Sequence, residues 1–112
     1  MANRGAWAER RATEFLEGRD YHIVDQNYHC HRGEIDLIAL DGDYVVFTEV
    51  RFRSSGSYSK PEESINSTKR RRIIHCAKRW IMENEYRGPS RFDVLALDRE
   101  GIRHYENVFQ LR

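Results

Sequence analysis

The chain has 112 residues, a net charge of +1, and charged and hydrophobic fractions of 33% and 39%. That length supports one modest hydrophobic core and not two, so we expect one domain over residues 1–112. The longest apolar run is far too short to cross a bilayer, which excludes a protein with a transmembrane helix. The opening residues, "MANRGAWAERR", lack the apolar stretch of a secretory signal and therefore favour the cytoplasm.

The first predicted element is a helix in "RGAWAERRATEFLEG", residues 4–18. The spacing predicts one shared helical face for Ala8, Ala12, Phe15 and Leu16, and Gly18 is a typical helix end. "YHIVDQN" then has the composition of a short strand, and "YHCHRG" that of a polar connector.

The segment "GEIDLIALDGDYVVFTEVRFR", residues 33–53, predicts a hairpin of two strands. "DGDY" supplies the turn, with Gly42 and Asp43 as its two central residues. This turn sets a register in which Asp36 faces Glu49, and directly opposed residues share a sheet face. The other residues of both faces are largely apolar, so we expect both faces to be buried.

The second half of the chain predicts a helix and another strand pair. "RSSGSYSKPEES" has the composition of a loop that turns into helix from about Pro61. The helix places Ile73, Ala77 and Trp80 on one apolar face, and "RFDVLALD" and "IRHYEN" follow as strands. The order α-β-β-β-α-β-β predicts an α+β fold, with a mixed sheet flanked by helices.

Positive charge is concentrated in the second helix. The segment from Thr68 to Trp80 carries +6 and contains no acid, which leaves −5 for the rest of the chain. Such a patch is typical of a nucleic-acid-binding surface, although a merely solvated helix face is the alternative. The predicted nucleic-acid-binding residues are Lys69, Arg70, Arg71, Arg72, Lys78 and Arg79.

Two converging carboxylates at one end of an apolar hairpin indicate a metal site, because like charges so close repel unless a cation lies between them. Asp36 and Glu49 offer only oxygen ligands, which suit Mg²⁺ or Mn²⁺ better than zinc. Such an ion supports phosphodiester hydrolysis, and Arg51, on the same face as Glu49, can stabilise phosphate charge. In the structural alternative, Glu34 pairs with Arg51, Asp36 caps a loop or meets a surface arginine, and Glu49 lies at an exposed strand end.

The chain has two cysteines, Cys30 and Cys76. In a cytoplasmic protein we expect them to be free thiols rather than one disulfide. "HCH", residues 29–31, adds side chains that zinc accepts, but their spacing does not match a usual zinc clip.

An Asp followed about a dozen residues later by Glu-x-Lys across a hairpin is the signature of the PD-(D/E)XK nuclease superfamily, which Asp36 and "EVR" resemble. Within it the chain resembles the small bacterial YraN-like proteins, which are similar to archaeal Holliday-junction resolvases. The resemblance covers nearly the whole chain. It is carried by "AWAERRATEFLEGRDYHIVDQN", the hairpin segment, the basic helix and "RFDVLAL".

The resemblance implies a restriction-endonuclease-like core and a Mg²⁺- or Mn²⁺-dependent nuclease that acts on DNA, including branched or otherwise structured DNA. It also implies that Glu9, on the first helix, joins Asp36 and Glu49 as a metal ligand, and that these three acids and Arg51 form the catalytic set.

Arg51 departs from the superfamily pattern, because it stands where the motif has a lysine. A guanidinium stabilises charge but cannot exchange a proton as an ammonium can. Lys69 on the second helix is an alternative source of the ammonium. Two other hypotheses stay open, a nucleic-acid-binding domain that does not cut and a protein-interaction module, as does the question of a homodimer.

Overall fold

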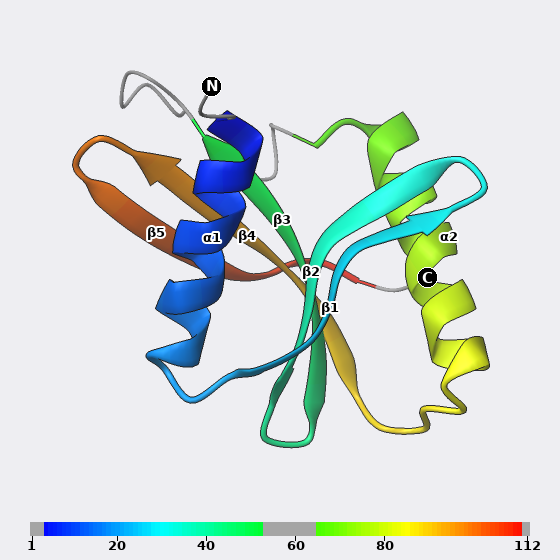
Figure 1. Cartoon of the computed structure of the whole chain (residues 1–112). Helices are drawn as coiled ribbons and strands as arrows, with labels where there is room; N and C mark the ends of the chain where they lie inside the picture. Colours follow the sequence, from blue (N-terminus) through cyan, green and yellow to red (C-terminus); the bar gives the residue numbers. More distant parts are fainter. Residues whose placement is uncertain (1–3, 53–64, 111–112) are drawn as a thin grey trace.

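The computed structural model describes residues 4–52 and 65–110, and the elements within them follow the predicted order (Figure 1). The helices are α1 (Arg4–Glu17) and α2 (Ser67–Glu83), neither of which is long and apolar enough to cross a membrane. The strands are β1 (His22–Cys30), β2 (Gly33–Asp41), β3 (Tyr44–Phe52), β4 (Ser90–Asp98) and β5 (Gly101–Phe109).

Two element boundaries differ from the prediction. β1 continues to Cys30, because the segment predicted as a polar connector pairs with β2. The predicted loop and the helix start at Pro61 lie outside the described residues, and α2 begins at Ser67. Asn66 caps it, since its side chain accepts a 2.9 Å hydrogen bond from the backbone N–H of Lys69.

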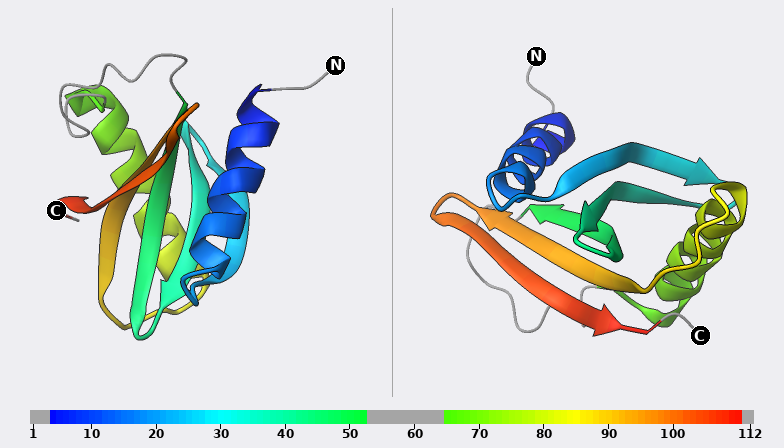
Figure 2. Two further views of the ribbon diagram at one scale, coloured as in Figure 1. Left: turned by 90° about the vertical axis from the view of Figure 1, so that its left-hand side faces the viewer. Right: turned by 90° about the horizontal axis from the view of Figure 1, so that it is seen from below.

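The described strands form one mixed sheet in the order β1-β2-β3-β4-β5. β3 and β4 run parallel, and the other neighbours are antiparallel. A parallel pair needs a crossover connection, and α2 lies in the connection between β3 and β4. Figure 2 shows the two helices on opposite faces of the sheet, which confirms the mixed α/β fold.

Each helix buries its predicted apolar face against one face of the sheet. Ala8, Ala12 and Leu16 of α1 are at most 3% exposed, and Ala77 of α2 is fully buried. The α1 side of the sheet contributes Leu37, Ala39, Val46, Leu95 and Leu97, and the α2 side contributes Ile35, Ile38, Val45, Phe47, Phe92 and Val94. Burial on both faces therefore supplies the apolar driving force that a chain of this length needs.

The β2–β3 hairpin has the predicted register up to a point of divergence. Pairs run from Asp41 opposite Tyr44 to Leu37 opposite Thr48, and Gly42 takes the positive φ of +59° that a primed turn requires. Beyond Leu37 the β1–β2 hairpin bends away from β3 toward α2 (Figure 1). The predicted backbone pairing of Asp36 with Glu49 is therefore not formed, because the ladder ends one residue earlier.

A buried ion-pair network joins the strands at the other end of the sheet. Asp93, with its side chain fully buried, lies 3.1 Å from Nε of Arg91 and 2.7 Å from Nε2 of His104. Arg91 also pairs with Asp41 at 3.1 Å and donates to the Tyr21 hydroxyl at 2.6 Å. Charges this deeply buried need such partners, so the network fixes β2, β4 and β5 relative to the end of α1.

Cys30 and Cys76 form a disulfide between the end of β1 and α2, so the prediction of free thiols is wrong. That prediction rested on the expected compartment, which does not determine which cysteines the fold brings together. Gly33 allows the same close approach, because a Cβ there would lie 3.2 Å from both Cβ of Arg72 and Sγ of Cys76. The β1–β2 turn is thus fastened to α2.

We expect reduction of the disulfide to lower the free energy of unfolding by roughly 2–4 kcal/mol, because the unfolded chain loses a crosslink. The crosslinked residues are 46 positions apart. Urea unfolding with and without dithiothreitol measures the effect, and a Cys30→Ser variant, which should not respond to dithiothreitol, is the matched control. An identical urea midpoint for the wild-type protein under both conditions would contradict the expectation.

Candidate metal and nucleic-acid site

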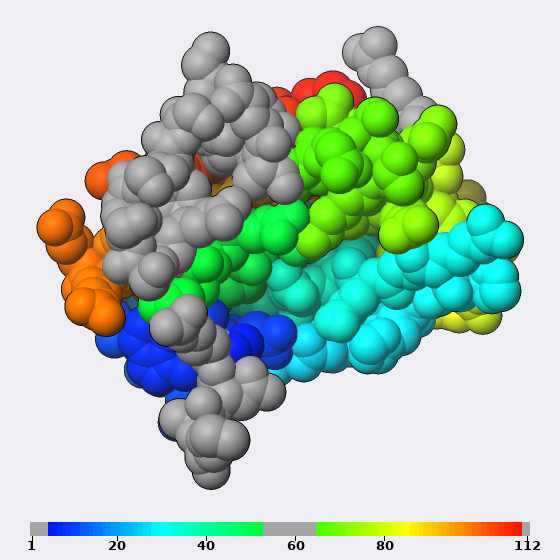
Figure 3. Space-filling model, turned by 90° about the horizontal axis from the view of Figure 1, so that it is seen from above, coloured from blue at the N-terminus to red at the C-terminus, as the bar shows by residue number. Residues whose placement is uncertain are grey.

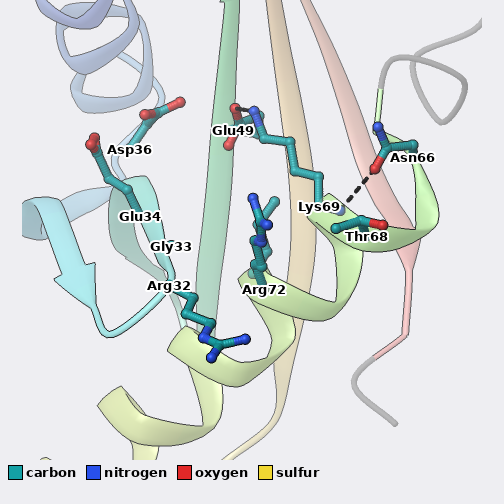
Figure 4. A pocket seen from close by; sticks show the side chains of 10 residues that line it. Arg32, Gly33, Glu34, Asp36, Glu49, Asn66, Thr68, Lys69 and Arg72 are labelled. Carbon is teal, nitrogen blue, oxygen red and sulfur yellow. Dashed lines mark hydrogen bonds and ion pairs between the residues drawn. The ribbon is translucent and has the colours of Figure 1, made fainter.

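A cleft of about 440 Å³ opens between the diverging strands β2 and β3 and the first turns of α2. In Figure 3 the surface is hollowed between the cyan β1–β2 hairpin and the green α2. Figure 4 shows how the side chains that line it converge. They belong to Arg32, Gly33, Glu34, Asp36, Glu49, Asn66, Thr68, Lys69, Arg72 and Ile73.

Asp36 lies where the strands separate. One of its carboxylate oxygens accepts a 2.8 Å hydrogen bond from the backbone N–H of Val50, so a side chain takes the place of the next ladder partner. Burial, and then the nearby charge of Glu49, raise the pKa of Asp36 to about 7. Glu9 and Glu34 add smaller effects in the same direction, and the hydrogen bond from Val50 opposes them.

Glu49 is buried, with 8% of its surface exposed, which contradicts the structural alternative that placed it at an exposed strand end. Its Oε1 lies 2.8 Å from Nζ of Lys69 and 3.7 Å from Nε of Arg51. The cation nearest to Glu49 therefore comes from α2 and not from the hairpin (Figure 4). Glu34 does not pair with Arg51 as that alternative required; it lies 3.9 Å from His29.

Glu9 approaches Asp36 from the other side of the sheet. A second cavity of about 230 Å³ is lined by Glu9, Ala8 and Gly5 of α1 together with Asp36, Val50 and Phe52. Asp36 therefore borders both hollows, and Glu9 reaches it from α1 while Glu49 reaches it from the cleft.

The donor set fits a hard divalent cation in part. Within residues 4–52 and 65–110, no three His, Cys, Asp or Glu side chains are close enough together to hold a metal ion. Mg²⁺, however, is usually held by one or two carboxylates and completes its shell with water and substrate phosphates. Asp36 and Glu49 match that requirement, and the raised pKa of Asp36 marks a place where positive charge would be favourable.

The six predicted nucleic-acid-binding residues occupy different environments. Lys69 reaches into the cleft, whereas Arg70 stacks on Phe109 with its guanidinium carbon 5.0 Å from the ring centre. Arg71 and Arg72 are exposed, as is Lys78. Arg79 is exposed as well and pairs with Glu83 at 3.1 Å. The helix thus presents a basic surface, but its members do not act as one uniform patch.

The sequence interpretation missed Arg32, Asn66 and Thr68, which also line the cleft. Asn66 was detectable, because an Asn directly before a helical segment is a typical N-cap. Arg32 was not, because its position depends on the bend of the β1–β2 hairpin toward α2, for which the sequence offers no local signal.

The fold and the cleft define a small mixed α/β protein with two carboxylates and an ammonium at a point of strand divergence. The model of the uncharacterised protein family UPF0102 matches residues 8–97, and the chain belongs to this family. A UPF0102 protein of Alcanivorax borkumensis is 43% identical over 98 residues, which cover 86% of this chain and 78% of that protein. One of Psychromonas ingrahamii is 38% identical over 110 residues, which cover 96% and 90% of the two chains. The predicted resemblance to the YraN-like family is thereby confirmed, and the relation to the PD-(D/E)XK nuclease superfamily stays a prediction.

We expect Asp36→Asn to stabilise the metal-free protein at pH 8, with an effect that shrinks as the pH is lowered. An aspartate in the unfolded chain loses its proton near pH 4, whereas folded Asp36 keeps it to about pH 7. The folded state therefore binds more protons between these values, and the wild-type protein loses stability as the pH rises through this window. Asparagine is uncharged and can still accept from Val50.

Thermal unfolding in EDTA at pH 5 and pH 8 measures this difference. Glu14→Gln, a change at an exposed acid of α1 that does not line the cleft, is the control and should show a much smaller pH dependence. A destabilisation by Asp36→Asn that is equal at both pH values would contradict the expectation.

Proposed function

We propose that this protein is a Mg²⁺- or Mn²⁺-dependent nuclease that hydrolyses phosphodiester bonds in DNA, with a site of the PD-(D/E)XK type. One observation carries the proposal. The carboxylates of Asp36 and Glu49, from two diverging strands, share a cleft with the ammonium of Lys69, which lies 2.8 Å from Glu49.

Each side chain of the cleft has a role in this proposal. A bound Mg²⁺ or Mn²⁺ would supply a nucleophilic water near neutral pH and neutralise charge on the phosphate. Asp36 and Glu49 would hold the ion, and the Val50 N–H keeps Asp36 oriented toward the cleft. Glu9 adds negative charge behind Asp36 and so strengthens the preference for a cation.

In this proposal Lys69 supplies the ammonium of the motif lysine, because the motif position itself is occupied by Arg51. It is only partly exposed, and its ion pair with Glu49 holds the ammonium beside the carboxylates. An ammonium orients a water or stabilises charge on a phosphate that enters the cleft, and it can exchange a proton, which a guanidinium cannot. Arg51, 3.7 Å from the same oxygen, adds fixed positive charge.

The second candidate is a nucleic-acid-binding domain that does not cut, and the observation that favours it is Arg51 at the motif lysine position. The two candidates predict different results with the same material. Purified protein is incubated with plasmid, single-stranded and four-way-junction DNA, with Mn²⁺ or with EDTA. Metal-dependent cleavage supports the nuclease, whereas binding without cleavage supports the second candidate. The absence of both binding and cleavage supports a protein-interaction module.

We expect the double variant Asp36→Asn/Glu49→Gln to lose the rise in melting temperature that Mn²⁺ gives the wild-type protein, because both metal-binding carboxylates are gone. The same variant should show no metal-dependent cleavage. Glu14→Gln/Glu17→Gln, which changes two exposed acids of α1, is the control for charge. If the double variant kept the full Mn²⁺ response, the metal would bind elsewhere.

We expect Lys69→Ala to lower the cleavage rate by about 10²-fold or more, the usual scale for removing a preorganised charge-stabilising group. Arg51→Ala should cost less, because its guanidinium lies farther from Glu49 than the ammonium does. Arg99→Ala, at an exposed position in the turn between β4 and β5 and outside the cleft, is the control and should leave the rate unchanged. The opposite ranking of Lys69→Ala and Arg51→Ala would assign the catalytic cation to the hairpin.

A further inference from the structure

A second hollow continues the cleft along α2. This groove has a volume of about 450 Å³ and shares Arg32, Thr68 and Arg72 with the cleft, so the two hollows lie side by side. One wall is the β1–β2 turn and the other is the outer face of α2. The residues that line the groove are His31, Arg32, Thr68, Arg71, Arg72 and His75.

The chemistry of the groove suits an extended anion. Three of its six lining residues are arginines and two are histidines, and none of the described residues that line it is acidic. The cleft, in contrast, contains three carboxylates. An anionic chain would therefore be repelled at the acids unless a cation were bound there, and attracted along the groove.

The lining residues that α2 contributes lie along one face of the helix. Thr68, Arg71, Arg72 and His75 follow one another at i, i+3, i+4 and i+7, which places them on one face over about 10 Å of helix. Phosphates on one strand of B-form DNA advance about 3.4 Å along the axis, so this length is enough to meet more than one of them. A hydroxyl, guanidinium groups and an imidazole all donate hydrogen bonds to phosphate oxygens.

The two walls are fixed to each other. The disulfide joins Cys30, two residues before Arg32, to Cys76, one residue after His75. Because Gly33 has no side chain, the turn lies close against the backbone and the Cβ of Arg72. The backbones that carry the donors are therefore held at a set separation before any ligand binds, which reduces the entropy cost of binding.

We propose that this groove binds the sugar-phosphate backbone of the nucleic-acid strand that leaves the cleft, with Arg32 and Arg71 on opposite walls as its main anchors. This proposal rests on the proposed function, because it names where the substrate of that site is held. The groove is a binding surface only. It adds nothing to the chemical step, and the imidazoles of His31 and His75 donate to phosphate rather than act as acid or base.

The test measures binding apart from cleavage. Anisotropy of fluorescein-labelled single-stranded and four-way-junction DNA is followed in EDTA over a range of NaCl concentrations. The variants are Arg32→Gln and Arg71→Gln, alone and combined. Arg99→Gln/Arg103→Gln removes the same charge from exposed positions at the β4–β5 end of the molecule and is the matched control. Both arginines of the groove variant are exposed, so melting temperatures should match the wild type.

We expect the combined groove variant to bind DNA about tenfold or more weakly at low salt, and the slope of log K against log salt to fall by roughly one or more. The control should change neither value beyond a small, nonspecific loss. In a cleavage assay with Mn²⁺ the groove variant should raise KM and leave kcat unchanged, because it removes uniform binding.

The outcomes separate this inference from the proposed function. If the groove variant binds like the wild type, or if the control loses as much as the groove variant, the groove assignment is overturned even when the wild type cleaves DNA. If the groove variant loses binding while the wild type shows no cleavage, the groove is upheld and the nuclease proposal fails. A wild-type protein that binds no DNA overturns both.

Discussion

The backbone N–H of Val50 donates to the carboxylate of Asp36 at the point where β2 leaves β3. In a continued ladder a backbone carbonyl would accept from that N–H, and the two strands would remain at hydrogen-bonding distance. Because a side chain accepts instead, the ladder stops, the β1–β2 hairpin turns toward α2, and the cleft opens between the separated ends. The same contact holds the partly buried carboxylate of Asp36 beside Glu49, a position that is unfavourable for a charged acid.

The two acids of the cleft are not equivalent. Glu49 has an ammonium 2.8 Å away and a guanidinium 3.7 Å away, whereas the interactions that shift Asp36 are mostly with other acids. Glu49 is thus paired with cations of the protein, whereas the neighbouring acids disfavour the charged form of Asp36 and the Val50 N–H favours it. A cation that entered the cleft would therefore gain most from Asp36. At the opposite end of the sheet, in contrast, the buried carboxylate of Asp93 pairs with both Arg91 and His104.

Much of this arrangement follows from local sequence signals. Short apolar segments predicted the strands, the spacing of Ala8, Ala12 and Leu16 predicted the buried face of α1, and "DGDY" set the register of the hairpin as far as Leu37. These features depend on residues close in the chain, which is why they could be predicted.

What could not be predicted depends on contacts between distant segments. The end of the β2–β3 ladder, the disulfide and the convergence of Arg32 with α2 all result from how the β1–β2 hairpin bends. The pairing of Lys69 with Glu49 depends in turn on where α2 begins, and the chain offered two signals for that start, at Pro61 and at Asn66.

A single helix, α2, carries residues of both the cleft and the groove. Lys69 faces Glu49, Arg71 and Arg72 face the groove, and Cys76 is bonded to Cys30. Because an α-helix turns about 100° per residue, inserting a single residue between Lys69 and Arg71 would swing every later side chain away from its present partner. Insertions or deletions inside this helix should therefore be tolerated far less well than substitutions on its exposed face, and natural variation in chain length within the family is expected to fall outside the stretch from Asn66 to Cys76.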